Sequence, residues 1–237
     1  MHESIEALNR RFKTASIEEV LAYFADQYRH KIALASSFGA EDQVLTDLLQ
    51  RHRGAVGIFT LDTGRLPDET YDVMDRTNLR YGIRIDVYAP DAADVEALYA
   101  IQGANGFYDS IENRKRCCHV RKIGPLKRAL QGLDVWITGL RREQSPTRDA
   151  MRLVEYDAAN GLIKLNPLIE WSEAEVWEHI RFRNLPYNRL HDKGYPSIGC
   201  APCTRAVSPG ADVRSGRWWW ENPEHKECGL HLKESTA

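Results

Sequence analysis

The sequence predicts an α/β protein built on a mostly parallel sheet with helices on both faces. Short apolar runs alternate with amphipathic helical patterns over much of the chain, and strands separated by helices of this length pair in parallel through crossover connections. The 237 residues suffice for one large domain with a substantial core. No apolar run approaches the roughly 20 residues that would span a bilayer, so we expect no membrane partner.

The predicted elements follow from apolar periodicity and capping residues. Two helices open the chain at 5–12 and 16–28, and Ser16 with Glu19 forms a capping box for the second. The elements that follow are a strand at 31–36, a helix at 41–51, a strand at 56–61, a helix at 67–81, a strand at 83–88, a helix at 93–101 and a strand at 135–138.

The last third of the chain is less regular. Segments 154–156 and 163–165 form a predicted hairpin through Asn160-Gly161. Ser172 and Glu175 form a second predicted capping box, for a helix at 172–182. Beyond residue 186 proline and glycine are frequent and periodicity is lost. We therefore predict two parts: residues 1–204 as one folded domain, and residues 205–237 as a mobile C-terminal arm.

Three turns at predicted strand ends indicate a ligand site. Ser36-Ser37, Asp62-Thr63-Gly64 and Gly139 each follow a strand, and ligands of open parallel sheets bind beyond the carboxyl ends of the strands. The turn Ser36-Ser37-Phe38-Gly39 also precedes a predicted helix, where N–H groups and hydroxyls can hold a phosphate or sulfate. It is neither a Walker A loop nor a G-x-G-x-x-G fingerprint.

The charge distribution restricts the class of ligand. A net charge of −2 gives no general attraction to a nucleic acid polymer or an anionic membrane. Basic residues nevertheless cluster beside the motifs, at 114–116, 121–122, 141–142 and 214–217. This pattern favours a compact anionic ligand.

The five cysteines occur in three contexts: the adjacent pair Cys117-Cys118, the pair Cys200 and Cys203, and Cys228 alone near the end. No secretory signal opens the chain, so we expect a cytoplasmic protein with reduced thiols. Two pairs supply a four-thiolate metal site, and the fifth cysteine is a candidate nucleophile. Neighbouring side chains on a helix diverge by about 100°, which suits a [4Fe-4S] cubane better than one zinc ion.

Taken together, the motifs resemble a known family. These motifs, in order, are Ser36–Asp42, Leu61–Arg65, Cys117-Cys118 with Arg121-Lys122, Thr138–Arg141, Cys200–Cys203, Gly216–Glu221 and Glu227–His231. They are similar to those of the iron–sulfur type of bacterial assimilatory adenylyl-sulfate reductase. With the phosphoadenylyl-sulfate reductases, these enzymes share the adenine-nucleotide α-hydrolase-like (PP-loop) fold. The resemblance covers residues 30–232.

The resemblance implies a role for each motif. Ser36, Ser37, Phe38 and Gly39 correspond to a modified PP-loop that holds the phosphosulfate, and Leu61, Asp62, Thr63, Gly64 and Arg65 to the adenosine-binding segment. Gly139 with Arg141, Arg142 and Arg148 corresponds to an arginine-rich loop that closes on the nucleotide. Arg214 and Arg217 would pair with phosphate or sulfate oxygens. Cys117, Cys118, Cys200 and Cys203 would be the ligands of a [4Fe-4S] cluster.

The implied reaction is reduction of adenosine 5′-phosphosulfate to sulfite and AMP. The Cys228 thiolate attacks the sulfur, and thioredoxin or a similar dithiol protein then releases sulfite from the S-sulfocysteine. Lys226 and His231 are candidates for lowering the pKa of the Cys228 thiol. Lys122, one helical turn from Cys118, is expected to orient the sulfate beside the cluster.

Three alternatives stay open from the sequence. The enzyme could also accept or prefer 3′-phosphoadenosine 5′-phosphosulfate. An ATP pyrophosphatase or adenylyltransferase would use the Ser36–Gly39 turn on ATP, and an iron–sulfur electron carrier or sensor would not need Cys228. The sequence leaves open which dithiol protein is the reductant and whether the chain forms a homo-oligomer.

Overall fold

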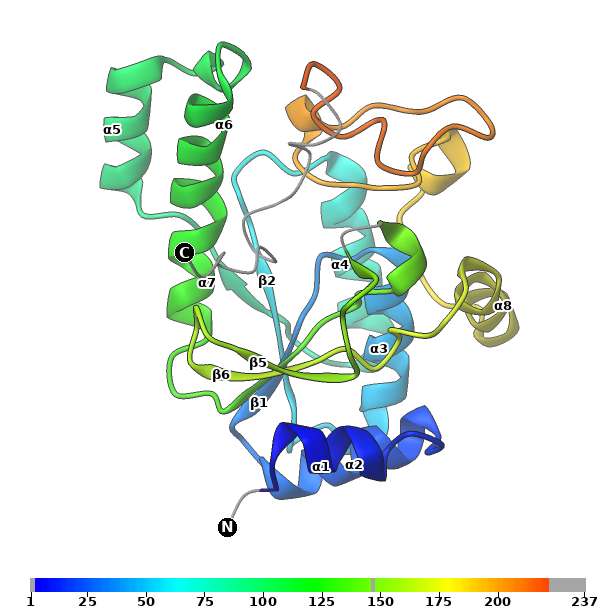
Figure 1. Cartoon of the computed structure of the whole chain (residues 1–237). Helices are drawn as coiled ribbons and strands as arrows, with labels where there is room; N and C mark the ends of the chain where they lie inside the picture. The colour runs from blue at the N-terminus through cyan, green and yellow to red at the C-terminus, as the bar shows by residue number, and fades with distance from the viewer. Residues whose placement is uncertain (1–2, 146–147, 222–237) are drawn as a thin grey trace. The chain divides into compact units, whose positions relative to one another are not determined.

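A computed structural model describes residues 3–145 and 148–221 of the chain (Figure 1). The chain divides into two compact units. Of the described residues, the first unit contains those up to Phe59, Asp72–Asp86 and Gly132–Asn188; the second contains Thr60–Tyr71, Val87–Gln131 and those from Arg189 on. Within the described ranges, no helix is both long and apolar enough to cross a membrane.

One six-stranded sheet has the strand order β3-β2-β1-β4-β6-β5. The strands are β1 (Ile32–Ala35), β2 (Gly57–Leu61), β3 (Asp86–Tyr88), β4 (Val135–Ile137), β5 (Val154–Asp157) and β6 (Leu162–Leu165). β1 pairs in parallel with β2 and β4, and β4 pairs in parallel with β6. Only the predicted hairpin, β5 with β6, is antiparallel among these pairs. The mostly parallel sheet is therefore confirmed.

The first unit has one main core formed by the sheet and its helices. These helices are α1 (Ile5–Arg11), α2 (Ile17–Gln27), α3 (Ala40–Leu49) and α8 (Glu173–Arg183). Phe24 of α2, Val44 of α3 and Leu34 of β1 are each 0% exposed within it. In β4 the consecutive residues Val135, Trp136 and Ile137 are all buried, so both faces of that strand are covered, as in parallel sheets generally.

Both predicted capping boxes are present. Ser16 and Glu19 begin α2, and Ser172 and Glu175 begin α8. In each box the serine oxygen accepts from the glutamate N–H, and the glutamate carboxylate accepts from the serine N–H. These two polar signals account for the close agreement between predicted and observed helix starts.

The strand predicted at 83–88 is shorter than expected. Only Asp86–Tyr88 forms β3, because the N–H of Ile83 donates to the Asn78 carbonyl and the N–H of Ile85 to the Asn78 side chain. These bonds attach the segment to the end of α4 (Asp68–Tyr81) instead of to the sheet. Ile85 is still buried, packed with Val73.

The second unit contains the helix predicted at 93–101, which is α5 (Ala92–Gln102), and helices that the periodicity did not delimit. The latter are α6 (Ile111–Cys118), a π-helical turn (His119–Ile123) and α7 (Gly124–Ala129), in continuous succession. Figure 1 shows α5 and α6 side by side. Short 3₁₀ turns lie at Gln50–His52, Gly106–Tyr108, Arg142–Gln144, His191–Lys193 and Ala201–Cys203.

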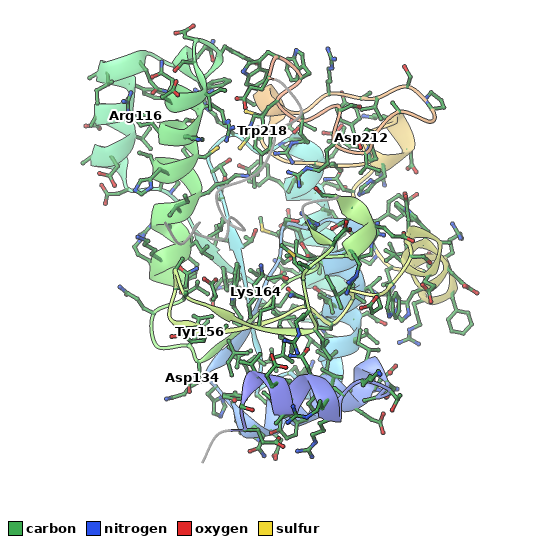
Figure 2. All side chains as sticks on the ribbon, viewed as in Figure 1. Arg116, Asp134, Tyr156, Lys164, Asp212 and Trp218 are labelled. Carbon is green, nitrogen blue, oxygen red and sulfur yellow. The ribbon has the colours of Figure 1, made fainter. Side chains whose placement is uncertain are left out.

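Residues 205–221, the first half of the predicted arm, pack back on the turn that holds Cys203. The Arg205 N–H donates to the Gly216 carbonyl and the Trp218 N–H to the Cys203 carbonyl. Trp218, labelled in Figure 2, is 1% exposed. Residues 222–237 lie outside the described residues, and the division at 204/205 stays a prediction.

Candidate active site

The turn that follows β1 in the first unit has a defined internal geometry. Phe38 adopts φ +58° and is 1% exposed, packed with Val73 and Ile85. The buried Ser36 hydroxyl accepts a hydrogen bond from the Phe38 N–H at 3.2 Å. Gly39 is the N-cap of α3. The buried Phe38 side chain thus fixes the predicted PP-loop turn to the apolar core, and the turn leads directly into the N-terminus of α3.

Asp42, on the first turn of α3, accepts hydrogen bonds from this turn. One carboxylate oxygen accepts from the Ser37 N–H at 2.6 Å and from the Ser37 hydroxyl at 2.7 Å. Burial raises the pKa of Asp42 to about 6, although the Ser37 hydrogen bonds act in the opposite direction. Asp42 was not among the predicted site residues, because an acidic residue in a first helical turn is usually a partner of the helix dipole.

Gly139 brings the end of β4 close to the same carboxylate. A Cβ at this position would lie 2.3 Å from the Asp42 Oδ1 and 3.0 Å from the Glu41 Cβ. Only glycine allows so close an approach. Two of the three predicted strand-end turns therefore meet in the first unit.

The arginine-rich segment is also attached to α3. Arg141 is 4% exposed and donates through Nε to the Glu41 carboxylate at 2.8 Å. The Gln144 side-chain amide donates to the same carboxylate at 2.9 Å, and its oxygen accepts from the buried Arg148. Sequence reasoning missed Glu41 and Gln144, since neither lies in a basic cluster.

Arg142 has a different environment from Arg141. Its guanidinium donates to the carbonyls of Asp149 and Met151 at 2.9 and 3.0 Å, and to the Glu170 carboxylate at 2.6 Å. In this structure Arg142 therefore braces its own loop, and the ligand-binding role implied for it stays a prediction.

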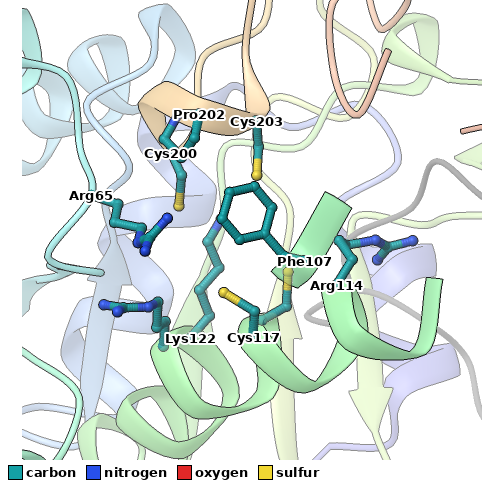
Figure 3. Close-up of a pocket in the computed structure, with 10 residues that line it drawn as sticks. Arg65, Phe107, Arg114, Cys117, Lys122, Cys200, Pro202 and Cys203 are labelled. Atoms are coloured by element: carbon teal, nitrogen blue, oxygen red, sulfur yellow. The ribbon is translucent and has the colours of Figure 1, made fainter. Parts of the chain in front are cut away.

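The four paired cysteines line one pocket of the second unit (Figure 3). Cys117 and Cys118 end α6, and Cys200 and Cys203 flank the short turn Ala201–Cys203. The hollow between them has about 320 Å³ of space, part of it open to solvent. Its other lining residues are Arg65, Phe107, Arg114, Arg121, Lys122 and Pro202. Two segments about 80 residues apart in sequence thus supply four thiols to one place.

The chemistry of this pocket suits a group that binds thiolates. Burial raises the pKa of Cys203 to about 12 and also raises that of Cys117, so both are neutral thiols unless a metal displaces the protons. Arg65, Arg121 and Lys122 in the lining would offset part of the negative charge of a tetrathiolate group, whereas the charge of Arg114 is paired with Glu221. No three Cys, His, Asp or Glu side chains of residues 3–145 and 148–221 converge on the position of one metal ion. Four thiolates are a usual ligand set of iron–sulfur clusters, so the residues present fit such a group.

The predicted adenosine-binding turn lies against the cysteines. The Cys200 thiol donates to the buried Thr63 hydroxyl at 3.2 Å, and the Ala201 N–H donates to the Arg65 carbonyl at 2.8 Å. Gly64 adopts φ +68°, a conformation that favours glycine. Arg65 itself lines the pocket. Two motifs that the sequence suggested separately are thus adjoining parts of one site in the second unit.

Lys122 also lines this pocket, as predicted from its spacing to Cys118. It lies on the π-helical turn His119–Ile123, so the helix widens where it passes the cysteines. Such turns are frequent at functional sites. On the same turn, Arg121 is 4% exposed and donates to the Thr63 carbonyl at 2.7 Å.

Arg114 and Glu221 form a buried ion pair at the pocket wall. Arg114 donates through Nε and one terminal nitrogen to the two carboxylate oxygens, at 2.9 and 2.7 Å. The side chains are 2% and 3% exposed. The Arg114 guanidinium also lies 4.8 Å from the Trp218 ring centroid and hydrogen-bonds Cys118. This pair fastens the segment that ends at Glu221 to α6.

Of the two predicted anion-pairing arginines, Arg217 lies against the cysteine turn. It is 7% exposed, with Nε 3.4 Å from the Cys203 carbonyl oxygen, and a Cβ on Gly199 would be 2.3 Å from its guanidinium. Arg214 is half-buried, and its N–H donates to the Asp212 carboxylate. Cys228 and His231, the predicted nucleophile and its neighbour, lie outside the described residues, as does Lys226.

Comparison with known proteins assigns the family. The phosphoadenosine phosphosulfate reductase domain matches residues 31–206. Proteins named adenosine 5′-phosphosulfate reductase are similar over most of the chain. That of Allochromatium vinosum is 58% identical, over 86% of this chain and 79% of its own length, and that of Burkholderia cepacia is 47% identical, over 94% and 89%.

Solved structures agree with the sequence comparison. The phosphoadenylyl-sulfate reductase from Candida auris, in a phosphate complex, superposes with a TM-score of 0.75 at 26% identity, over 87% of this chain and 99% of that one. The FMN adenylyltransferase of Candida glabrata has a TM-score of 0.57 at 16% identity, over 99% and 82%, a likeness of fold alone. The chain belongs to the phosphoadenosine phosphosulfate reductase family, alongside the bacterial adenosine 5′-phosphosulfate reductases.

Proposed function

We propose that this protein reduces adenosine 5′-phosphosulfate to sulfite and AMP in sulfate assimilation, with thioredoxin or a similar dithiol protein as the reductant. The observation that carries the proposal is the pocket of four cysteines adjoining the Asp62–Arg65 turn, in a chain that is 58% identical to one protein named adenosine 5′-phosphosulfate reductase. The chemistry needs free thiols, which agrees with a cytoplasmic enzyme.

The proposed reaction has two steps, both at sulfur. The Cys228 thiolate attacks the sulfur of the phosphosulfate; the bond from that sulfur to the bridging oxygen breaks, and AMP leaves with the electron pair. A thioredoxin thiolate then attacks the Cys228 Sγ, and sulfite leaves with the S–S electron pair. The second thioredoxin thiol resolves the mixed disulfide, so the dithiol supplies both electrons. The C-terminal arm would carry Cys228 between these partners, with its packed first half, residues 205–221, as the anchor.

The chain's own residues have separate tasks in this scheme. The Ser36–Gly39 turn and Arg141 would hold the nucleotide's anionic groups, while Asp62–Arg65 would hold the adenosine. Lys122 would orient the sulfate from the wall of the cysteine pocket. A [4Fe-4S] cluster held by Cys117, Cys118, Cys200 and Cys203 would, when bound, contribute fixed charge beside the sulfate.

Intact-mass analysis tests the reaction class. Reduced protein is mixed with adenosine 5′-phosphosulfate without thioredoxin, and the expected result is the addition of one SO₃ group to the tail peptide containing Cys228. The Cys228→Ser variant should keep its iron and its visible absorption but form no sulfite. Unmodified wild-type protein, or release of pyrophosphate from ATP, would contradict the proposal.

The cofactor has its own test. Serine at each of the four paired cysteines should lower the iron content of anaerobically purified protein, whereas Cys228→Ser should not. Lys122→Ala should retain iron but lose most sulfite formation, with Lys127→Ala, an exposed lysine on α7, as the matched control. A colourless preparation containing zinc and no iron would overturn the assignment.

A second substrate is suggested by the family match, since the matching domain is named for phosphoadenosine phosphosulfate. The chain would then also accept or prefer the 3′-phosphorylated nucleotide. Rates of sulfite formation from the two nucleotides at equal concentration discriminate the possibilities. We expect adenosine 5′-phosphosulfate to be faster.

A further inference from the structure

The first unit places a carboxylate where an anionic ligand is expected. Both donors of Ser37, the N–H and the hydroxyl, point to one oxygen of Asp42, at 2.6 and 2.7 Å. Ser37 itself is exposed, whereas Asp42 is 6% exposed. A phosphosulfate that approaches Ser37 from solvent therefore meets donors that a buried negative charge already uses.

Asp42 lacks the compensation that its neighbour has. Glu41, the adjacent carboxylate on α3, is paired with Arg141 at 2.8 Å and with Gln144 at 2.9 Å. Among residues 3–145 and 148–221, no basic side chain lies within ion-pair distance of Asp42. An ionised carboxylate buried without a cation is costly, so its charge is the easiest in this loop to neutralise.

The position of Asp42 is fixed by three segments. The turn after β1 supplies Ser37, α3 supplies Asp42 and Glu41, and the turn after β4 leaves room for Oδ1 only because residue 139 is glycine. The charged group that acts on it is Glu41 from its own helix, and Glu41 is itself paired with Arg141 from the segment after β4. These contacts hold the Asp42 side chain where it is. The repulsion between its charge and that of an incoming anion is therefore removed by protonation of the carboxylate, not by movement of the side chain.

We propose that Asp42 is a positioning residue that holds the Ser37 donors ready for the phosphosulfate and takes up a proton from solvent when the anion binds. This inference rests on the proposed function. Two anions that share one set of donors cannot both stay ionised at low cost. The protonated acid keeps an oxygen that accepts from Ser37 and no longer repels the ligand.

The titration of Asp42 agrees with this arrangement. Burial raises its pKa to about 6, with a smaller contribution from Glu41, against the lowering effect of the Ser37 hydrogen bonds. In most molecules of the ligand-free protein, Asp42 is then ionised at pH 7.5. A bound anion raises the pKa of Asp42 further, so binding at this pH takes up about one proton per nucleotide at most.

Calorimetry tests the proton uptake. The Cys228→Ser protein, which cannot turn over, is titrated with adenosine 5′-phosphosulfate at pH 7.5 in buffers of different ionisation enthalpy. The buffer dependence of the binding enthalpy gives the number of protons taken up. We expect a clear uptake in this protein and none after adding Asp42→Asn, whose amide oxygen still accepts from Ser37. Asp26→Asn, at an exposed carboxylate on α2, is the matched control and should keep the uptake.

A second measurement does not require the Asp42→Asn variant to fold. The affinity of the Cys228→Ser protein should increase as the pH falls from 8 to 6, by up to about tenfold per pH unit. Buffer-independent enthalpy together with pH-independent affinity would overturn the inference while leaving the proposed function intact. Equal proton uptake in folded Asp42→Asn protein would also overturn it. Absence of any binding would instead refute the proposed function.

Discussion

The buried Arg114–Glu221 pair gives a sharp prediction about what fastens the C-terminal segment. Replacement of Glu221 by alanine leaves the Arg114 guanidinium in a site where its side chain is 2% exposed, with two hydrogen bonds of 2.9 and 2.7 Å lost. Removing one partner of a buried pair typically costs about 3–5 kcal/mol. We expect Glu221→Ala to lower the free energy of unfolding by this amount.

The assay is equilibrium urea unfolding followed by tryptophan fluorescence, because Trp218 lies 4.8 Å from the Arg114 guanidinium. The exposed pair Arg152–Glu6 is the matched control, with side chains 43% and 63% exposed. Glu6→Ala should leave the free energy of unfolding nearly unchanged, because exposed ion pairs contribute little.

A double variant separates charge from shape. Arg114→Met with Glu221→Met fills a similar volume without any charge, and such replacements are often neutral or stabilising. We expect it to recover most of the stability that Glu221→Ala loses. A cost below about 1 kcal/mol for Glu221→Ala would refute the reasoning, since the pair would then behave like the exposed control. A double variant as unstable as the single one would show that packing, not charge, dominates.

Three further predictions concern the first unit. Gly139→Ala should cost about 1–3 kcal/mol of stability by overpacking against Asp42 and weaken nucleotide binding, whereas Gly124→Ala, with no atom nearer than 3.7 Å, should be tolerated in both assays. The pKa of Asp42 is raised to about 6, so the folded protein binds a proton more tightly than the unfolded chain. The free energy of unfolding of the wild type should therefore fall as the pH rises from about 4 to 6, by up to about 3 kcal/mol relative to Asp42→Asn. Parallel pH profiles of the two proteins would contradict this. Burial raises the pKa of Asp47, but hydrogen bonds, led by the one from Arg183, lower this pKa below 3.8 overall. The wild type should therefore lose stability relative to Asp47→Asn as the pH falls below 3.8. Equal acid sensitivity of the two proteins would contradict this prediction.

Sequence patterns predicted most of the fold because local signals and burial agreed there. The apolar run at 32–35 became a buried central strand, and the serine–glutamate boxes fixed two helix starts. The prediction was too long at 83–85, where Asn78 competes with the sheet for backbone donors. That competition depends on tertiary placement, which an apolar pattern does not encode.

The sequence predicted the motifs of the candidate site better than it predicted the contacts between them. The four cysteines were expected to act together, and they line one pocket. Their contact with the Asp62–Arg65 turn through Thr63 was not foreseen, nor was the use of the Ser37 donors by Asp42. Both links depend on side-chain directions at element ends, which a single sequence does not specify.

The π-helical turn at His119–Ile123 has a consequence for how this protein tolerates insertion and deletion. A π turn holds one residue more than an α turn, so deleting one residue there would let the helix close up into regular α geometry. Each residue of an α-helix advances about 100°, and Arg121 would then rotate away from the Thr63 carbonyl that it now reaches at 2.7 Å. Such a shortened chain could keep every cysteine and every arginine of the pocket, yet Arg121 would no longer face the Thr63 turn.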